Sequence, residues 1–152
     1  LAELNKHETG LVTLRDATVD QVNHWLEKGS LYHRRALHVV TENKRVAAFE
    51  LCAQMGDIRN AGRLMNQSHE SLQNQYEVSC EELDFLQQQA AKCNSIYGSR
   101  MMGGGFGGCT ISLIQEVDER DISIIRQAYL KKFGLLPDYF TVHPAPGLVH
   151  YG

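Results

Sequence analysis

The stretch YGSRMMGGGFGGCTISLI, residues 97–114, decides how the second half of the chain folds. It places five of the chain's 13 glycines within the six positions 103–108. The residues after the glycines, CTISLIQ, are β-branched and alternating, which is typical of a strand. The residues before them, SIYGSRMM, also favour a strand, so the sequence predicts two strands joined by a glycine turn.

The familiar nucleotide-binding glycine loops do not fit this context. Gly103, Gly105 and Gly108 satisfy the spacing GxGxxG, but a dinucleotide site requires a helix after the glycines, and here a strand follows. A P-loop ends in Lys followed by Ser or Thr, whereas Cys109 follows the last glycine. A protein-kinase glycine loop does join two strands, but the chain has neither an HRD nor a DFG motif.

Two interpretations of the glycine turn remain open. A tight hairpin needs one or two glycines at positive φ, and five glycines exceed that need. Successive backbone N–H groups in such a turn can instead form an anion-binding concavity, which would use the surplus. Arg100, at the end of the incoming strand, is a candidate phosphate contact, although we favour a structural salt bridge for it.

Four helices are expected before the glycines, because apolar residues recur at helical spacing between cap and stop residues. Thr18 and Gln21 form a capping-box pair at the start of the first helix, and Ser79 is the expected cap of the fourth. On the second helix, His38 and Glu42 are spaced as a surface i,i+4 pair. The four expected helical segments are residues 18–28, 30–55, 57–74 and 79–93.

After the glycine turn, the sequence predicts one more helix and two more strands. The helix runs from the cap Asp118 to Gly134, and the strands cover residues 138–143 and 147–151. Together with the two strands around the glycines this makes four. The expected fold class is therefore α+β, an antiparallel sheet with helices packed on one face.

Composition limits the classes of function. The 152 residues favour a single domain, and the net charge of -3 excludes the strong basic field of a nucleic-acid-binding protein. No apolar run reaches the length of a membrane span. The four cysteines form no CxxC pair, so we expect reduced thiols, no metal site and a cytoplasmic location. The chain begins at Leu1, and we expect it to be part of a longer protein.

Three stretches resemble one family. GSRMMGGGFGGCTISLI is similar to the third conserved motif of galactokinases, which belong to the GHMP superfamily of small-molecule kinases. LMNQSHESLQNQYEVSCEELDFL, residues 64–86, and YHRRALHVVTENKRV, residues 32–46, resemble two further galactokinase segments. The resemblance runs from about Leu14 to the end of the chain. Met102 departs from it, since the family more often has Thr there.

The resemblance implies a two-domain enzyme of which residues 1–152 form the C-terminal domain, a ferredoxin-like four-stranded antiparallel sheet with additional helices. The family's catalytic aspartate, serine-rich phosphate loop and galactose signature lie in the N-terminal domain, and none of these motifs occurs here. The whole enzyme would use ATP and Mg²⁺ to phosphorylate galactose at its anomeric hydroxyl. The chain alone would be inactive, with no catalytic and no metal-binding residue assigned to it.

The resemblance also implies where this chain meets the substrates and its partner. The glycine turn would form one wall of the cleft near the phosphates or the sugar, with Arg100 as a candidate phosphate contact. Its own N-terminal domain would be its partner, and an apolar patch is expected around residues 41–44 or beside the glycine turn. Two alternatives stay open: a sugar- and nucleotide-sensing homologue, and an interaction module without kinase activity. The residues assigned to the turn are Gly103, Gly104, Gly105, Phe106, Gly107 and Gly108.

Overall fold

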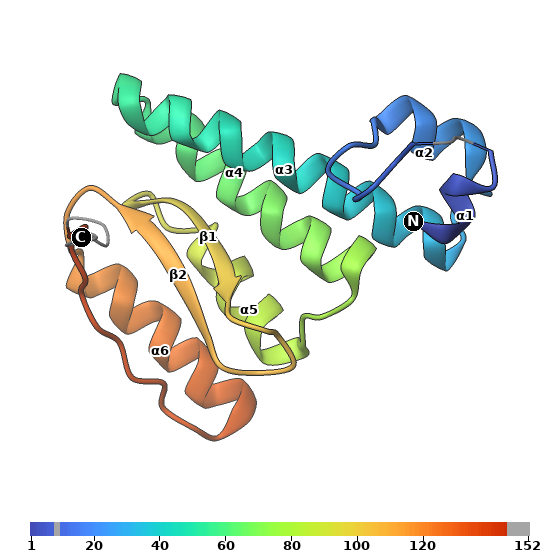
Figure 1. The fold of residues 1–152 in the computed structure, drawn as a ribbon. Coiled ribbons are helices and arrows are strands. Elements are labelled where there is room, and N and C mark those ends of the chain that lie inside the picture. The colour runs from blue at the N-terminus through green and yellow to red at the C-terminus, as the bar shows by residue number, and fades with distance from the viewer. Residues whose placement is uncertain (8–9, 146–152) are drawn as a thin grey trace, which may run out of the picture.

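A computed structural model describes residues 1–7 and 10–145 of the chain (Figure 1). Most of it is helical, with one pair of strands late in the sequence. The elements in chain order are α1 (Ala2–Asn5), α2 (Val19–Trp25), α3 (Leu31–Met55), α4 (Ile58–Ser71), the π-helix η1 (Leu72–Tyr76), α5 (Glu81–Ala90), β1 (Ile96–Met102), β2 (Cys109–Ile114) and α6 (Glu119–Phe133).

The helix boundaries follow local signals in the sequence. Thr18 and Gln21 form both hydrogen bonds of the expected capping box at the start of α2. The long helix α3 ends where Gly56 adopts a left-handed φ of 70°. One expected cap is wrong: α5 begins after Cys80, because the Ser79 hydroxyl donates to Asp84 instead of capping the helix.

The helices α3 and α4 lie side by side along one side of the strand pair, and α6 lies on its other side (Figure 1). The strands are antiparallel, with Met102 opposite Cys109 on either side of the glycine turn. The helix α4 approaches β1 so closely at Gly62 and Gly98 that a Cβ on either glycine would overlap the backbone of the other element.

Side chains of α4 cover the outer edge of β1. The Ser99 N–H donates to Asn66 Oδ1 at 2.9 Å, and the Met101 N–H donates to His69 Nδ1 at 3.1 Å. A helix that satisfies the free N–H groups of an edge strand prevents that edge from pairing with another strand. Among the described residues, the outer edge of β2 carries no paired strand.

The α+β class is confirmed, but the strand expected over residues 138–143 is wrong. This segment is irregular and runs along α6, where Arg126 Nε donates to the Pro137 carbonyl at 2.8 Å and Tyr139 bonds Glu119. An isolated segment with strand composition gains no ladder hydrogen bonds without a neighbouring strand, and Phe140 stays 84% exposed. The strand expected over residues 147–151 lies outside the described residues.

Two hydrophobic clusters hold the elements together. The first packs α1 and α2 on the N-terminal half of α3, around Leu4, Val22 and Val40. The second joins Leu72, Leu83 and Met101, directly below the glycine turn. The side chains on the C-terminal half of α3 are largely exposed, including the large apolar residues Val46, Phe49, Leu51 and Met55.

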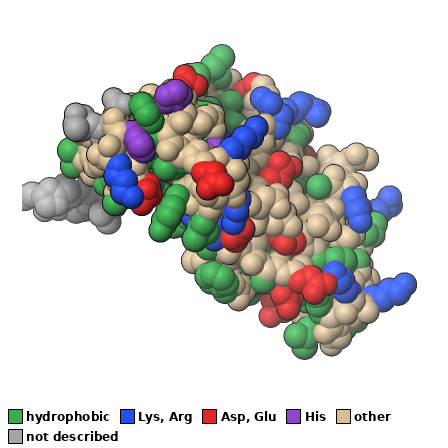
Figure 2. Space-filling view, turned by 90° about the vertical axis from the view of Figure 1, so that its right-hand side faces the viewer, with side chains coloured by type: hydrophobic (Ala, Val, Ile, Leu, Met, Phe, Trp, Pro, Cys, Tyr) green, Lys and Arg blue, Asp and Glu red, His purple; other side chains and the backbone are tan. Residues whose placement is uncertain are grey.

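The surface carries charges of both signs. Figure 2 shows basic and acidic side chains interspersed over one face of the molecule. Within the described residues, no helix combines the length and hydropathy that crossing a membrane would require.

Candidate functional site: the glycine turn and its supports

The backbone of the glycine turn is mostly left-handed. Gly103, Gly105, Gly107 and Gly108 have φ values of 86°, 88°, 141° and 100°. Residues with a Cβ rarely adopt such φ values, so the conformation of the turn itself requires four of its five glycines. The expectation that one or two glycines would suffice for the turn is therefore wrong. Gly104 is the one glycine of the turn whose φ does not require glycine.

Gly104 differs from its neighbours in having neither constraint. Its φ lies outside the left-handed range, and no heavy atom lies within 4 Å of the position that a Cβ would occupy. Gly105 is the opposite case, because a Cβ there would collide with the carbonyl of Val78. The space above Gly104 is open to solvent or to a bound molecule, whereas Gly105 is required by the protein's own packing.

The tip of the turn is anchored to the segment that precedes α5. The Phe106 N–H donates to the Val78 carbonyl at 2.8 Å, while the Phe106 side chain is 77% exposed at a φ of 60°. A non-glycine residue at such a φ carries strain of order 1–2 kcal/mol, which the anchor helps to maintain. Beside Phe106 lies a hollow of about 440 Å³, lined by Leu14, Arg35, Val39, Tyr76, Glu77, Val78 and Phe106.

Glu77 fixes the segment that carries Val78. It follows η1 with a left-handed φ of 58°, and its carboxylate binds Arg35 at 2.7 Å and Arg34 at 2.9 Å. The hydrogen bond from Arg35 and the charges of both arginines lower the pKa of Glu77. Short π-helical turns often occur at functional sites. Here the π-helix ends two residues before Val78, whose carbonyl accepts from the Phe106 N–H in the glycine turn.

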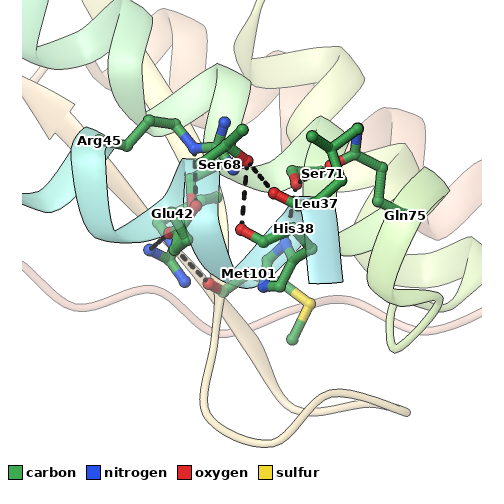
Figure 3. Close-up of polar contacts among 10 residues, drawn as sticks. Leu37, His38, Glu42, Arg45, Ser68, Ser71, Gln75 and Met101 are labelled. Carbon is green, nitrogen blue, oxygen red and sulfur yellow. Dashed lines mark hydrogen bonds and ion pairs between the residues drawn. The ribbon is translucent and has the colours of Figure 1, made fainter. Parts of the chain in front are cut away.

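Arg100 forms a partly buried ion pair with Glu42. Its guanidinium binds Glu42 Oε1 at 3.3 Å and donates through Nε to the Met101 carbonyl at 3.1 Å. Glu42 also binds Arg45 Nε at 2.7 Å and accepts from the Ser68 hydroxyl (Figure 3). Burial would raise the pKa of Glu42, but these hydrogen bonds and positive charges outweigh burial and lower it. The structural salt bridge that we favoured for Arg100 is thus present.

Sequence spacing misplaced His38 and left open whether His69 holds the glycine turn. His38 is buried and its Nδ1 lies 2.8 Å from the Ser71 hydroxyl on α4, so it is not part of a surface pair (Figure 3). His69 is buried between β1 and α5, where it bonds Met101 and Asp84. These partners are 15 to 33 positions apart. The helical pattern shows only that the histidines lie on faces that also carry apolar residues.

No group of three or more His, Cys, Asp or Glu side chains in residues 1–7 and 10–145 has the geometry to hold a metal ion. What the glycine turn offers is exposed backbone. Protein side chains support the strand that enters the turn. Arg100 is held by its ion pair with Glu42, and His69 accepts from the Met101 N–H. The arrangement is suited to contacting a ligand through N–H groups on a braced loop.

Comparison with protein families matches residues 47–133 to the C-terminal domain of the GHMP kinases, described as "GHMP kinases C terminal". The matched segment includes the last nine residues of α3, all of α4, η1, α5 and α6, and the glycine turn with both strands.

Individual relatives agree. A galactokinase from Roseiflexus is 45% identical over 107 residues, covering 70% of this chain and 27% of the relative. A galactokinase from Halalkalibacterium halodurans is 34% identical over 154 residues, covering 97% of this chain and 38% of the relative. The crystal structure of Lactococcus lactis galactokinase complexed with galactose superposes with a TM-score of 0.76 at 31% identity, covering 88% of this chain and 35% of that one. The chain thus spans well under half the length of these relatives.

Proposed function

Since the chain belongs to the GHMP kinase family, as a C-terminal domain of the galactokinase type, we propose that it is the C-terminal domain of a sugar kinase. The complete protein would transfer the γ-phosphoryl group of ATP to the anomeric hydroxyl of galactose, giving galactose 1-phosphate. The observation that supports this most strongly is the fold shared with a galactokinase over nearly the whole chain. The four free cysteines support a cytoplasmic location.

In this proposal the glycine turn forms one wall of the substrate cleft. Phosphoryl transfer depends on positioning and on stabilising negative charge, which preorganised N–H groups provide. The open space above Gly104 would admit a phosphate or sugar oxygen close to the backbone. Arg100, which is partly exposed beside its ion pair with Glu42, would contribute positive charge near the phosphates and remains a candidate contact.

ATP and Mg²⁺ would be held mainly by the N-terminal domain of the complete protein. The chain itself would contribute backbone contacts and leave the metal to its partner domain. When bound, Mg²⁺ would neutralise charge on the phosphates. The chain's own part would be to orient those phosphates and to exclude water from one side.

The N-terminal domain is the proposed partner of two surfaces. The first is the apolar C-terminal half of α3, adjacent to the polar turn at residues 43–44. The second lies beside the glycine turn, where Phe106 is 77% exposed.

The four-stranded sheet would be completed at the outer edge of β2, which carries no paired strand among the described residues. The α4 side chains leave no N–H groups free at Ser99 and Met101 on the outer edge of β1, so growth of the sheet is expected at β2.

The test compares the complete protein with the 152-residue chain. Each is purified free of host kinase and incubated with ATP, Mg²⁺ and galactose, and formation of galactose 1-phosphate is followed. We expect turnover by the complete protein and none above the blank by the chain alone. Turnover by the chain alone would contradict the two-domain proposal. Binding of galactose and ATP by the complete protein without turnover would indicate a sensor instead of a kinase.

A further inference from the structure

His69 is buried where the strand that enters the glycine turn meets α4 and α5. Its ring is 1% exposed, with Nδ1 3.1 Å from the Met101 nitrogen and Nε2 3.1 Å from Asp84 Oδ1. A backbone N–H can only donate, so Nδ1 is the acceptor of this pair. The ring proton must then lie on Nε2 and point at Asp84. The two contacts together define one neutral tautomer.

Asp84 connects this ring to the segment that anchors the tip of the turn. Its Oδ1 also accepts from the Ser79 hydroxyl at 2.5 Å, and its Oδ2 accepts from Gln73 Nε2 at 2.8 Å. Gln73 and Ser79 lie on either side of Val78, whose carbonyl receives the Phe106 N–H. Asp84 therefore ties together the chain before and after the residue that holds the turn.

The hydrogen bonds of Asp84 thus connect two contacts that position the glycine turn. His69 holds Met101 just before it, and Val78 holds Phe106 within it. The ladder between β1 and β2 ends with the pair Met102 and Cys109, so the unpaired part of the turn begins at Gly103, two residues after the His69 contact. A displacement of Met101 would therefore also displace the glycines that follow it.

We propose that His69 is a positioning residue for the glycine turn: its neutral ring links the Met101 N–H to Asp84 and so fixes where the turn begins and where its N–H groups point. The consequence for catalysis rests on the proposed function. The link itself can be measured in the chain alone. A histidine that served only as core filling would contribute to stability without setting the geometry of the turn.

Two substitutions separate the two ends of the ring. His69→Asn places an amide oxygen close to the position of Nδ1, which keeps the acceptor for Met101 and loses the contact with Asp84. His69→Gln places an amide nitrogen near the position of Nε2, which keeps the donor to Asp84 and loses the acceptor. The pair is matched in burying one amide group, so both variants are expected to lose comparable stability.

The measurement is amide hydrogen exchange by NMR on the 152-residue chain, together with a denaturant midpoint. We expect the Met101 amide to exchange roughly five- to tenfold faster in His69→Gln than in His69→Asn, the factor that one net hydrogen bond provides. The amide resonances of residues 103–108 should move in His69→Gln and stay near their wild-type positions in His69→Asn. The ring ¹⁵N shifts of the wild type should show a protonated Nε2 and an unprotonated Nδ1.

Equal Met101 exchange in the two variants would overturn the proposal, as would a proton on Nδ1 of the wild type. The wild-type tautomer decides the matter even where a variant fails to fold. In the complete protein, His69→Gln should lower kcat by roughly ten- to a hundredfold with little change in KM, and His69→Asn should restore most of it. A wild-type protein that does not phosphorylate galactose would refute the proposed function and leave the NMR result standing.

Discussion

Single residues of the glycine turn differ in what their positions require. A Cβ at Gly103, Gly107 or Gly108 would meet open space but would force a side chain into a left-handed φ. At Gly105 it would also collide with Val78. Only Gly104 among the turn's glycines is free of both constraints, so it is the position where a ligand's need for space can be separated from the turn's own chemistry.

Gly104→Ala is therefore expected to leave the folded chain intact. At a φ that other residues tolerate, this change raises the free energy of unfolding by about 0.4–1 kcal/mol, because it restricts the unfolded chain. If phosphate or sugar approaches the backbone here, the added methyl group should lower kcat/KM of the complete protein by about 10²-fold. A denaturant midpoint and steady-state kinetics on the same variant provide the two measurements.

Gly105→Ala is the matched control. It should lower the free energy of unfolding by about 1–3 kcal/mol, since it combines a left-handed φ with a collision at Val78. A Gly104→Ala variant with unchanged kinetics would show that no ligand approaches the turn at this point. The glycines would then serve only the backbone conformation of the turn.

Acid is expected to weaken the contacts between α3, α4 and β1 in two steps. Burial lowers the pKa of His38 and of His69 from 6.5, so the unfolded chain binds these protons first, and stability falls as the pH drops below 6.5 toward the folded values. The pKa of Glu42 is lowered from 4.5, so its stabilisation is complete above that value and is lost as the pH falls through the folded pKa. Urea midpoints at several pH values would show both steps.

Glu42→Gln should remove most of the second step. It should also lower the free energy of unfolding near pH 7 by about 1–3 kcal/mol, because the charge-assisted hydrogen bonds to Arg45 and Ser68 are weakened. Glu50→Gln on the exposed side of the same helix serves as the control and should behave like the wild type. An acid transition unaffected by Glu42→Gln would assign the loss of stability to other carboxylates.

At the scale of elements, the crossing of α4 and β1 determines where the strand pair sits. Gly62 and Gly98 let the two backbones meet, and Asn66 and His69 then reach the strand's outer N–H groups.

Gly98→Ala should therefore be strongly destabilising, although alanine is ordinarily favoured over glycine in a strand by about 0.5–1 kcal/mol. Its Cβ would overlap the Gly62 carbonyl, and separating α4 from β1 would weaken both edge hydrogen bonds. We expect a loss of about 1–3 kcal/mol or more by chemical denaturation. A midpoint close to that of Gly104→Ala would mean that the two elements can move apart without cost.

At the scale of the whole molecule, the C-terminal half of α3 projects large apolar side chains that no described element covers. Leu51 is 57% exposed and Met55 is 73% exposed. Contiguous exposed apolar residues of this kind mark interaction sites in many proteins. In the proposed enzyme the N-terminal domain would cover them.

Leu51→Glu should change the free energy of unfolding of the chain by no more than about 0.5 kcal/mol, as is usual at exposed positions. Its affinity for a separately produced N-terminal domain should fall at least about tenfold, equivalent to about 1.4 kcal/mol. Gln54→Glu, an exposed polar position on the same helix, adds the same charge as the control. Titration calorimetry measures both, and equal affinity in the two variants would place the interface elsewhere.

Much of the local structure could be predicted from the sequence, since its signals lie within a few residues of one another. The capping box at Thr18 and Gln21, the stops at Gly56 and Gly134, and the two strands around the glycines all formed as expected. The α+β class followed from the change of period at the glycine turn, and the family followed from motifs within the same stretches.

The tertiary structure alone decided which distant residues meet. Arg100 pairs with Glu42, which is 58 positions away, and His69 binds Met101, which is 32 positions away. No local sequence pattern indicates the close contact of Gly62 with Gly98. The segment over residues 138–143 shows the converse, because strand composition without a neighbouring strand leaves its hydrogen bonds unmade. Caps and turns are satisfied by the chain beside them, whereas a strand, a buried ion or a buried histidine takes its state from the partner that packing brings to it.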